Sequence, residues 1–275
     1  MTRPILLELT GALADAVRDR EPGAVGAVGA AAASVAGFVI GGERPLRLDP
    51  VATALTLAVD APGAAVAVGS DGLRDAPYNA ARRLLSVDHL TGGRAGAVFR
   101  TGEGGAGRTA ERIRVIRELW NSWPRESLIA DRSAGVYAEA GGIRRIAHEG
   151  EHYRVAGALN SPSSLQGEPV SIWRVETAEE IALSDGLVDV VAVGAGALAA
   201  ELVGAWEALD ERTRPALAHA DAGTIALRRA ASTAELREQA SGPAASASGT
   251  LRERLGVARR TLDLSDRPLA FGAAR

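Results

Sequence analysis

Residues 76–99 read APYNAARRLLSVDHLTGGRAGAVF, and this stretch contains a complete helix-and-strand unit. A segment of helix length, residues 78–90, is followed by the turn Thr91-Gly92-Gly93 and then by the apolar run 95–99. A helix that leads through a glycine turn into a short apolar strand is typical of α/β proteins with a parallel sheet. The stretch therefore predicts an α/β fold.

The same alternation recurs along the chain. Further segments of helix length lie at 49–59 and 108–123. In the helix predicted at 108–123, which Pro124 ends, the apolar residues recur every three or four positions and form one stripe. The members of this stripe are Ile113, Ile116, Leu119, Trp120 and Trp123. Apolar runs that predict strands are 5–9, 37–40, 64–68, 95–99, 170–173, 187–193 and, more weakly, 223–227.

Seven parallel strands in 275 residues predict a single TIM-type (β/α)8 barrel domain, for which about 250 residues is usual. No eighth strand follows the seventh, so we expect a barrel that is incomplete or shortened at its carboxyl-terminal end. An open barrel exposes unpaired backbone groups. We therefore expect a partner chain, as in a homo-oligomer, or residues 262–271 to cover the gap. Residues 124–168 break the strand–helix rhythm and predict an insertion, and the Ser-, Gly-, Pro- and Ala-rich residues 241–250 predict a flexible loop.

The composition excludes several classes of function. The chain has no cysteine, so disulfides, thiolate metal sites and cysteine nucleophiles are excluded. All 31 basic residues are arginine, which excludes lysine Schiff bases and a P-loop lysine. The formal net charge of −3 does not indicate binding to nucleic acid or to an anionic membrane. The start of the chain lacks a signal-peptide pattern, and no segment has transmembrane character, so we expect a cytoplasmic protein.

Two short motifs resemble ligand sites. His148-Glu-Gly-Glu-His152 matches H-E-x-x-H, in which a helix presents two histidines to zinc. Gly150 and the alternation of residues 153–155 instead favour a turn between two short strands, with diverging histidines and no metal. Residues 102–107, GEGGAG, match G-x-G-x-x-G between a strand and a helix. Because no ribose-binding acid follows at the expected place, a flexible loop is favoured there, although an anion site remains open.

Two blocks of sequence resemble the luciferase-like flavin-dependent monooxygenases, in the branch of nitrilotriacetate monooxygenase, dibenzothiophene sulfone monooxygenase and pristinamycin IIA synthase. Residues 76–96 are similar to the third helix and fourth strand of this branch. Segments between residues 117 and 169 are similar to its insertion between the fourth and fifth strands. The resemblance covers most of residues 37–194 in order.

The resemblance implies a barrel that binds reduced FMN at the carboxyl ends of its strands. A separate flavin reductase supplies the FMN, and the family oxygenates a small organic substrate. On the family's pattern, the cofactor-binding residues here are Ser70 after the third strand, Thr101 after the fourth and Thr177 after the fifth, and Arg174 is added as a residue that would offset the acids at that strand end. The resemblance assigns no catalytic residue and no metal.

The sequence departs from the family at this flavin site. Val98 stands where relatives carry an asparagine, and Gly41-Gly42 stand where they place an acid. Glu176 replaces a phosphate-facing serine, and its charge repels a phosphate dianion. Arg174 offsets this repulsion only if it points inward.

Three functions remain open at this stage. The first is a shortened FMN-dependent two-component monooxygenase. The second is a non-catalytic paralogue that has lost FMN binding and serves as a binding or partner subunit. The third is an enzyme that binds a deazaflavin or a nicotinamide near residues 102–107.

Overall fold

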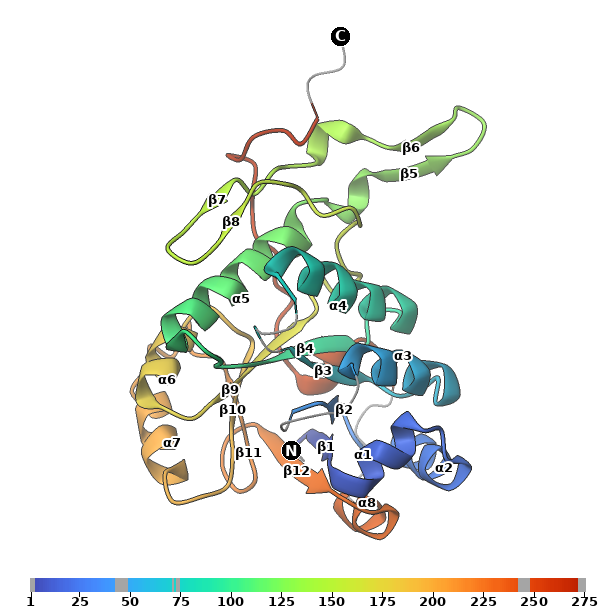
Figure 1. Cartoon of the computed structure of the whole chain (residues 1–275), viewed down its shortest axis with the longest axis vertical. Helices are drawn as coiled ribbons and strands as arrows, with labels where there is room; N and C mark the ends of the chain where they lie inside the picture. The colour runs from blue at the N-terminus through green and yellow to red at the C-terminus, as the bar shows by residue number, and fades with distance from the viewer. Residues whose placement is uncertain (1–2, 43–48, 71, 73–74, 242–247, 272–275) are drawn as a thin grey trace.

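The computed structural model describes residues 3–42, 49–70, 72, 75–241 and 248–271, and its centre is a closed barrel of eight parallel strands (Figure 1). The last strand pairs with the first over five positions, from Ile5–Ala226 to Leu9–Ala230, and this pairing closes the barrel. The predicted TIM-type barrel is confirmed. In spatial order the strands are β1 (Ile5–Leu9), β2 (Gly37–Ile40), β3 (Val66–Ser70), β4 (Ala95–Arg100), β9 (Val170–Val175), β10 (Val190–Val193), β11 (Ala216–His219) and β12 (Ile225–Ala230).

The prediction of an incomplete barrel is wrong. All seven predicted strands are present, with boundaries within three residues of the expected ones, but the seventh is the eighth strand of the barrel. The strand that was missed, β11, has the sequence Ala-Leu-Ala-His, and alanine has a low preference for strands. Residues 220–224 join β11 to β12 without a helix, so the rhythm that identified the other strands is lost there. Because the barrel is closed, the reason given for a homo-oligomer no longer applies.

Helices surround the barrel, and they include the three predicted at 49–59, 78–90 and 108–123 (Figure 1). The described helices are α1 (Gly11–Arg18), α2 (Pro22–Ala31), α3 (Pro50–Asp60), α4 (Pro77–Thr91), α5 (Gly105–Asn121), α6 (Ala178–Ser184), α7 (Ala199–Glu207), α8 (Thr233–Gln239) and α9 (Leu251–Leu255). None of them combines the length and the apolar character needed to cross a bilayer.

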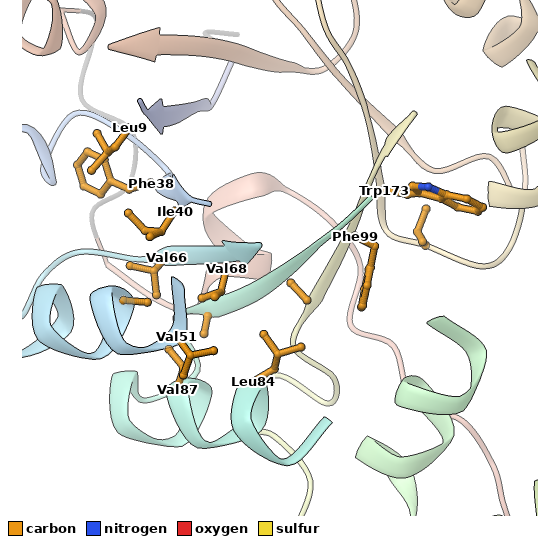
Figure 2. Close-up of a cluster of buried hydrophobic side chains, with 14 of the residues drawn as sticks. Leu9, Phe38, Ile40, Val51, Val66, Val68, Leu84, Val87, Phe99 and Trp173 are labelled. Carbon is orange, nitrogen blue, oxygen red and sulfur yellow. The ribbon is translucent and has the colours of Figure 1, made fainter. Parts of the chain in front are cut away.

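The barrel strands bury both of their faces, as alternation of side chains requires. In β1, Leu6 packs inside the barrel with Ala67 and Ile172, whereas Leu7 belongs to the layer between the strands and the helices. Figure 2 shows part of this outer layer, where side chains of β2, β3 and β4 meet those of α3 and α4. Burial of each large apolar side chain stabilises the fold by about 1.5–3 kcal/mol.

The short helix α9 closes the amino-terminal end of the barrel. Leu251 and Leu255 complete the inner apolar cluster. A Cβ atom added at Gly37 or Gly96, near the starts of β2 and β4, would lie about 3 Å from the side chain of Leu251. These two glycines therefore make room for the leucine.

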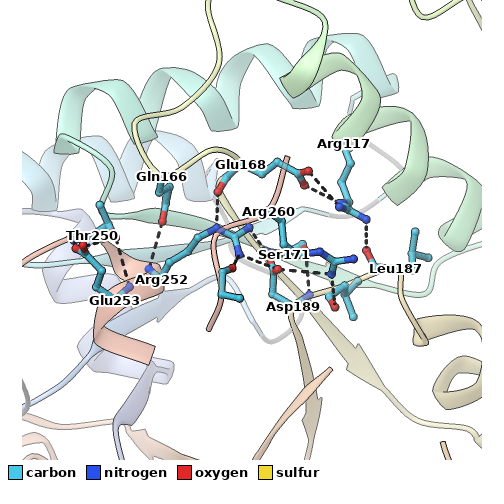
Figure 3. A network of polar contacts seen from close by, with 12 residues as sticks. Arg117, Gln166, Glu168, Ser171, Leu187, Asp189, Thr250, Arg252, Glu253 and Arg260 are labelled. Atoms are coloured by element: carbon cyan, nitrogen blue, oxygen red, sulfur yellow. Dashed lines mark hydrogen bonds and ion pairs between the residues drawn. The ribbon is translucent and has the colours of Figure 1, made fainter. Parts of the chain in front are cut away.

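A buried ionic network holds α9 in place (Figure 3). The Arg252 guanidinium donates from Nη1 and Nη2 to the two carboxylate oxygens of Asp189, at 2.8 and 2.9 Å. Its Nε donates to the backbone carbonyl of Glu168 at 3.0 Å, and the Glu168 carboxylate in turn pairs with Arg117 at 2.7 Å. The network links the carboxyl-terminal part of the chain to the barrel.

Residues 124–168, between α5 and β9, form two antiparallel hairpins beside the barrel (Figure 1). These consist of β5 (Leu128–Asp131) with β6 (Val136–Ala138), and β7 (His148–Glu149) with β8 (Arg154–Val155). The carboxyl-terminal residues run along this insertion, since the amide of Arg145 donates to the carbonyl of Pro268 and the amide of Ala270 donates to that of Ile143. They do not cover a barrel edge, which corrects that expectation. Most of the loop predicted at 241–250 lies outside the described residues.

Candidate ligand site at the mouth of the barrel

Three arginines meet at the carboxyl ends of the barrel strands. Arg100 ends β4, Arg174 lies near the end of β9 and Arg229 near the end of β12. They line one cavity of about 680 Å³, together with the Gly- and Ala-rich segment 194–199 after β10. Ligands of TIM barrels bind at this end of the strands.

A buried carboxylate organises two of these arginines. Glu8 points into the barrel from β1 and is completely buried. Its Oε1 lies 2.7 Å from Nη1 of Arg174, and its Oε2 lies 3.0 Å from Nε of Arg229. A buried charge is tolerated only when it is paired, so the two guanidiniums allow the acid to occupy the barrel interior.

Gly42, just beyond β2, joins the arginines to Glu8. Its carbonyl oxygen accepts hydrogen bonds from Nη1 of Arg100 and, at 3.3 Å, from Nη1 of Arg174. A Cβ atom at Gly42 would lie 2.0 Å from Oε1 of Glu8. A larger residue at position 42 would collide with the buried Glu8 carboxylate of the neighbouring strand, so the position requires glycine.

A second, smaller cavity of about 190 Å³ lies between residues 102–103, which follow β4, and the insertion at 124–168. Arg100, Arg108 and Arg112 line it, with Tyr153 of the insertion. Nε of Arg108 donates to the Tyr153 hydroxyl at 3.3 Å, and Nη2 of Arg112 donates to the Ser70 hydroxyl at 3.0 Å. This cationic cavity could hold an anion.

The H-E-x-x-H segment forms the β7–β8 hairpin, which confirms the prediction of a turn between two strands. His148 pairs with the Glu111 carboxylate through Nε2 at 3.0 Å, and its Nδ1 lies 3.6 Å from Glu118. Glu111 also accepts the backbone amides of His152 and Tyr153, each at 2.9 Å. Burial alone would raise the pKa of Glu111, but these hydrogen bonds and the His148 charge lower it overall. Glu111 thus anchors the hairpin to α5. No group of three or more potential metal ligands occurs among the described residues.

We compared the chain with known proteins. No protein-family model matches it. It is 34% identical over 190 residues to one of the subunits of pristinamycin IIA synthase of Streptomyces pristinaespiralis, and the match covers 67% of this chain and 68% of that protein. The chain belongs to the luciferase-like flavin-dependent monooxygenase family. A dibenzothiophene-sulfone monooxygenase of Rhodococcus erythropolis is 29% identical over 151 residues, which cover 49% of this chain and 33% of that protein.

Solved structures of luciferase-like proteins share the fold. EDTA monooxygenase from Chelativorans sp. BNC1 superposes with a TM-score of 0.62 at 20% identity, over 79% of this chain and 64% of that chain. Long-chain alkane monooxygenase superposes with a TM-score of 0.61 at 16% identity, over 75% of this chain and 61% of that chain. The chain thus spans less than two thirds of each of these two enzymes and one third of the sulfone monooxygenase.

The four residues predicted to bind the flavin lie at the carboxyl ends of β3, β4 and β9. Nη2 of Arg112 donates to the Ser70 hydroxyl, and the Thr101 hydroxyl accepts from the indole of Trp173 at 3.3 Å. Arg174 points inward to Glu8, as it must if it is to offset the acids of this strand end. Thr177 caps α6 by accepting the Glu180 amide at 3.2 Å.

A carboxylate of the protein accepts hydrogen bonds from the backbone amides at the end of β9, where the family's pattern places the phosphate. The carboxylate oxygen Oε2 of Glu180 accepts the backbone amide of Thr177 at 2.9 Å and that of Glu176. The sequence had indicated Glu176 as the acid in this position. Its side chain is instead 72% exposed and pairs with Arg100 at 3.2 Å.

Three residues of the mouth were not predicted from the sequence, namely Glu8, Arg100 and Arg229. One signal was available, since Glu8 is the single charged residue of the apolar run 5–9. A charge inside a buried strand indicates a partner from elsewhere in the chain. No local signal marked Arg100 or Arg229, because their convergence depends on the closure of the barrel.

Proposed function

We propose that this chain is a companion subunit of a two-component flavin-dependent monooxygenase, in which another luciferase-like chain holds the reduced FMN. The observation that carries the proposal is the carboxylate of Glu180 on the amides of Glu176 and Thr177. An FMN phosphate at this strand end would have to displace that carboxylate. The residues at the end of β9 therefore do not fit the cofactor.

Electrostatics support the same conclusion. Acids in the first turn of a helix stabilise its positive end, and here Glu179 and Glu180 occupy that turn. A phosphate dianion brought close to them experiences a repulsion of about 4 kcal/mol for each pair of unit charges 4 Å apart near a protein surface. Arg174, the residue that could offset this charge, directs Nη1 into the barrel toward Glu8, and no ion pair joins it to Glu179 or Glu180 among the described residues.

The names of two relatives fit a subunit role. One is named as a subunit of pristinamycin IIA synthase, and another is named as a component of nitrilotriacetate monooxygenase from Aminobacter aminovorans, which is 35% identical over 113 residues. We propose by analogy that this chain associates with a longer flavin-binding barrel. A flavin reductase would supply that barrel with reduced FMN for oxygenation of a small organic substrate.

Anaerobic titration of the chain alone with reduced FMN tests the proposal. A ligand present at 100 times its dissociation constant stabilises a fold by about 2.7 kcal/mol. We expect no saturable change in flavin absorbance and no rise in melting temperature up to several hundred micromolar FMN. Saturable binding by the unmodified chain would contradict the proposal.

The double variant Glu176→Ser/Glu180→Ser is expected to gain FMN affinity, because it removes the Glu180 carboxylate from the amides at the end of β9 and the negative charge of Glu176 from the same strand end. The measurement is the same titration, with Glu179→Ser as the matched control. Glu179 is an exposed acid of the same helical turn that makes no hydrogen bond to these amides. A double variant that remains as insensitive to FMN as the control would show that charge is not what excludes the phosphate.

A second candidate function is FMN-dependent monooxygenation by the chain itself. The smaller cavity favours it, because Arg108, Arg112 and Tyr153 present donors that suit a phosphate. In that case the unmodified chain binds FMN and Arg108→Gln weakens the binding. A melting-temperature shift with a deazaflavin or a nicotinamide, but not with FMN, would support the third alternative.

A further inference from the structure

Arg174 has donors that the protein does not use. The residue is only 8% exposed, and its Nη1 bonds to Glu8 and to the Gly42 carbonyl. Its Nε and Nη2 make no hydrogen bond to any described residue. Nη2 faces Gly194, where an added Cβ atom would lie 3.8 Å away, and both residues line the 680 Å³ cavity. Because Arg174 lines the cavity, these donors are available to a ligand that enters it.

A second guanidinium stands beside this one. Arg100 and Arg174 both donate to the carbonyl oxygen of Gly42, so their charged groups converge on one atom. Of these two arginines, Arg174 pairs with the buried Glu8, and Arg100 pairs with Glu176. Glu176 is 72% exposed, and an exposed pair contributes little. The charge of Arg100 is therefore only weakly offset by Glu176 at the place where a ligand would enter.

The opposite wall of the cavity carries no charge. It consists of the backbone and small side chains of residues 194–197, followed by Leu198 and Leu202. The cavity volume lies within the usual range of small-molecule sites, about 300–1,000 Å³. One side of the cavity thus suits an anion and the other an apolar group.

We propose that the barrel mouth binds a small carboxylic acid with an apolar body. Its carboxylate would accept from Nη2 of Arg174 and from the neighbouring Arg100, because a guanidinium matches a carboxylate in shape and charge. The apolar body would lie against residues 195–202. This inference goes beyond the subunit role and does not depend on it, since it concerns a ligand other than flavin.

Calorimetric titration of the full chain with sodium octanoate tests the proposal, with 1-octanol and inorganic phosphate as comparison probes. We expect saturable binding of octanoate at one site, with octanol at least about tenfold weaker, since a hydrogen bond to a charged group contributes about 1.5–3 kcal/mol. Octanoate that does not saturate, or phosphate that binds more tightly than octanoate, would overturn the proposal.

Two variants locate the site. Glu8→Gln/Arg174→Gln removes the guanidinium without leaving an unpaired buried charge, and we expect it to weaken octanoate binding about tenfold or more. Ala195→Phe adds bulk to an exposed position of the cavity wall without changing charge, and it should also reduce binding strongly. The control Arg108→Gln alters the neighbouring cavity and should leave binding unchanged.

With two cavity variants, the octanoate test remains decisive even if one variant does not fold, and it does not depend on whether the chain binds flavin. If the double variant does not fold, Ala195→Phe still decides the outcome. Octanoate binding that neither cavity variant affects would place the ligand elsewhere and contradict the assignment. The companion-subunit proposal stands or falls on the separate FMN titration.

Discussion

Replacing Arg252 with methionine is expected to lower the free energy of unfolding by about 3–5 kcal/mol, because it leaves a buried carboxylate without its charged partner. Arg252 is 2% exposed and makes a bidentate pair with Asp189. The remaining partners of Asp189 are the amide and hydroxyl of Ser171, at 2.8 and 2.9 Å, and Arg260 at 3.6 Å. Urea denaturation at pH 7 measures the effect.

The loss of unfolding free energy caused by Arg252→Met should depend on pH. Burial by itself would raise the pKa of Asp189, but Arg252, Ser171 and Arg260 together lower it. A carboxyl group with a lowered folded-state pKa stabilises the fold above its unfolded pKa of about 3.9, and this contribution disappears as the pH falls through the folded-state value. Without Arg252, burial dominates and the folded-state pKa rises, so Asp189 can protonate in mild acid. The difference between the variant and the natural protein should therefore shrink from pH 7 to pH 4.

Two controls accompany this variant. Arg212→Met removes an arginine whose side chain is 87% exposed, and the expected change is within about 0.5 kcal/mol. Combining Arg252→Met with Asp189→Asn should recover part of the loss, because the uncompensated charge is removed. A double variant less stable than Arg252→Met would show that lost packing, rather than the charge, is responsible.

Trp120→Ala is expected to destabilise the fold by about 3–5 kcal/mol, the usual effect of removing a large buried aromatic side chain. Trp120 lies in α5 and is completely buried, and its indole donates to the carbonyl of Ala81 in α4 at 3.0 Å. The substitution leaves a cavity between these helices and removes the hydrogen bond that joins them at Ala81. Thermal or urea unfolding measures the loss.

The matched control is Trp123→Ala, three residues further along the chain. Trp123 is partly exposed, donates to the Ser127 hydroxyl at 2.9 Å and packs edge-on against Tyr137 of the β5–β6 hairpin. We expect a loss of about 1 kcal/mol, close to the average for single substitutions. Equal losses for the two tryptophans would contradict the burial argument.

The apolar stripe predicted for α5 illustrates both the strength and the limit of periodicity. Four of its five members, Ile113, Ile116, Leu119 and Trp120, are completely buried as the spacing indicates. Trp123 is not, because α5 ends at Asn121 and the chain turns into the insertion. Periodicity identified the buried face, but the end of the helix decided where that face stops.

The mouth of the barrel shows how much of the candidate site could be predicted from the family resemblance. Ser70, Thr101, Arg174 and Thr177 were predicted to lie at strand ends, and the structure places them at the ends of β3, β4 and β9. Thr177-Ala-Glu-Glu180 matches the sequence pattern of a capping box, so the sequence by itself predicts that the Glu180 carboxylate reaches back to the Thr177 amide, and the structure confirms this contact.

The sequence by itself determined the fold class, the family and seven of the eight barrel strands. These features depend on local alternation and on continuous blocks of sequence, which can be read along the chain. The tertiary structure alone decided the closure of the barrel through β11 and β12, and the meeting of Glu8 with Arg174 and Arg229. The pairing of β1 with β12 and the contacts of Glu8 join residues more than 160 positions apart, and they are determined by the stagger of the strands around the barrel.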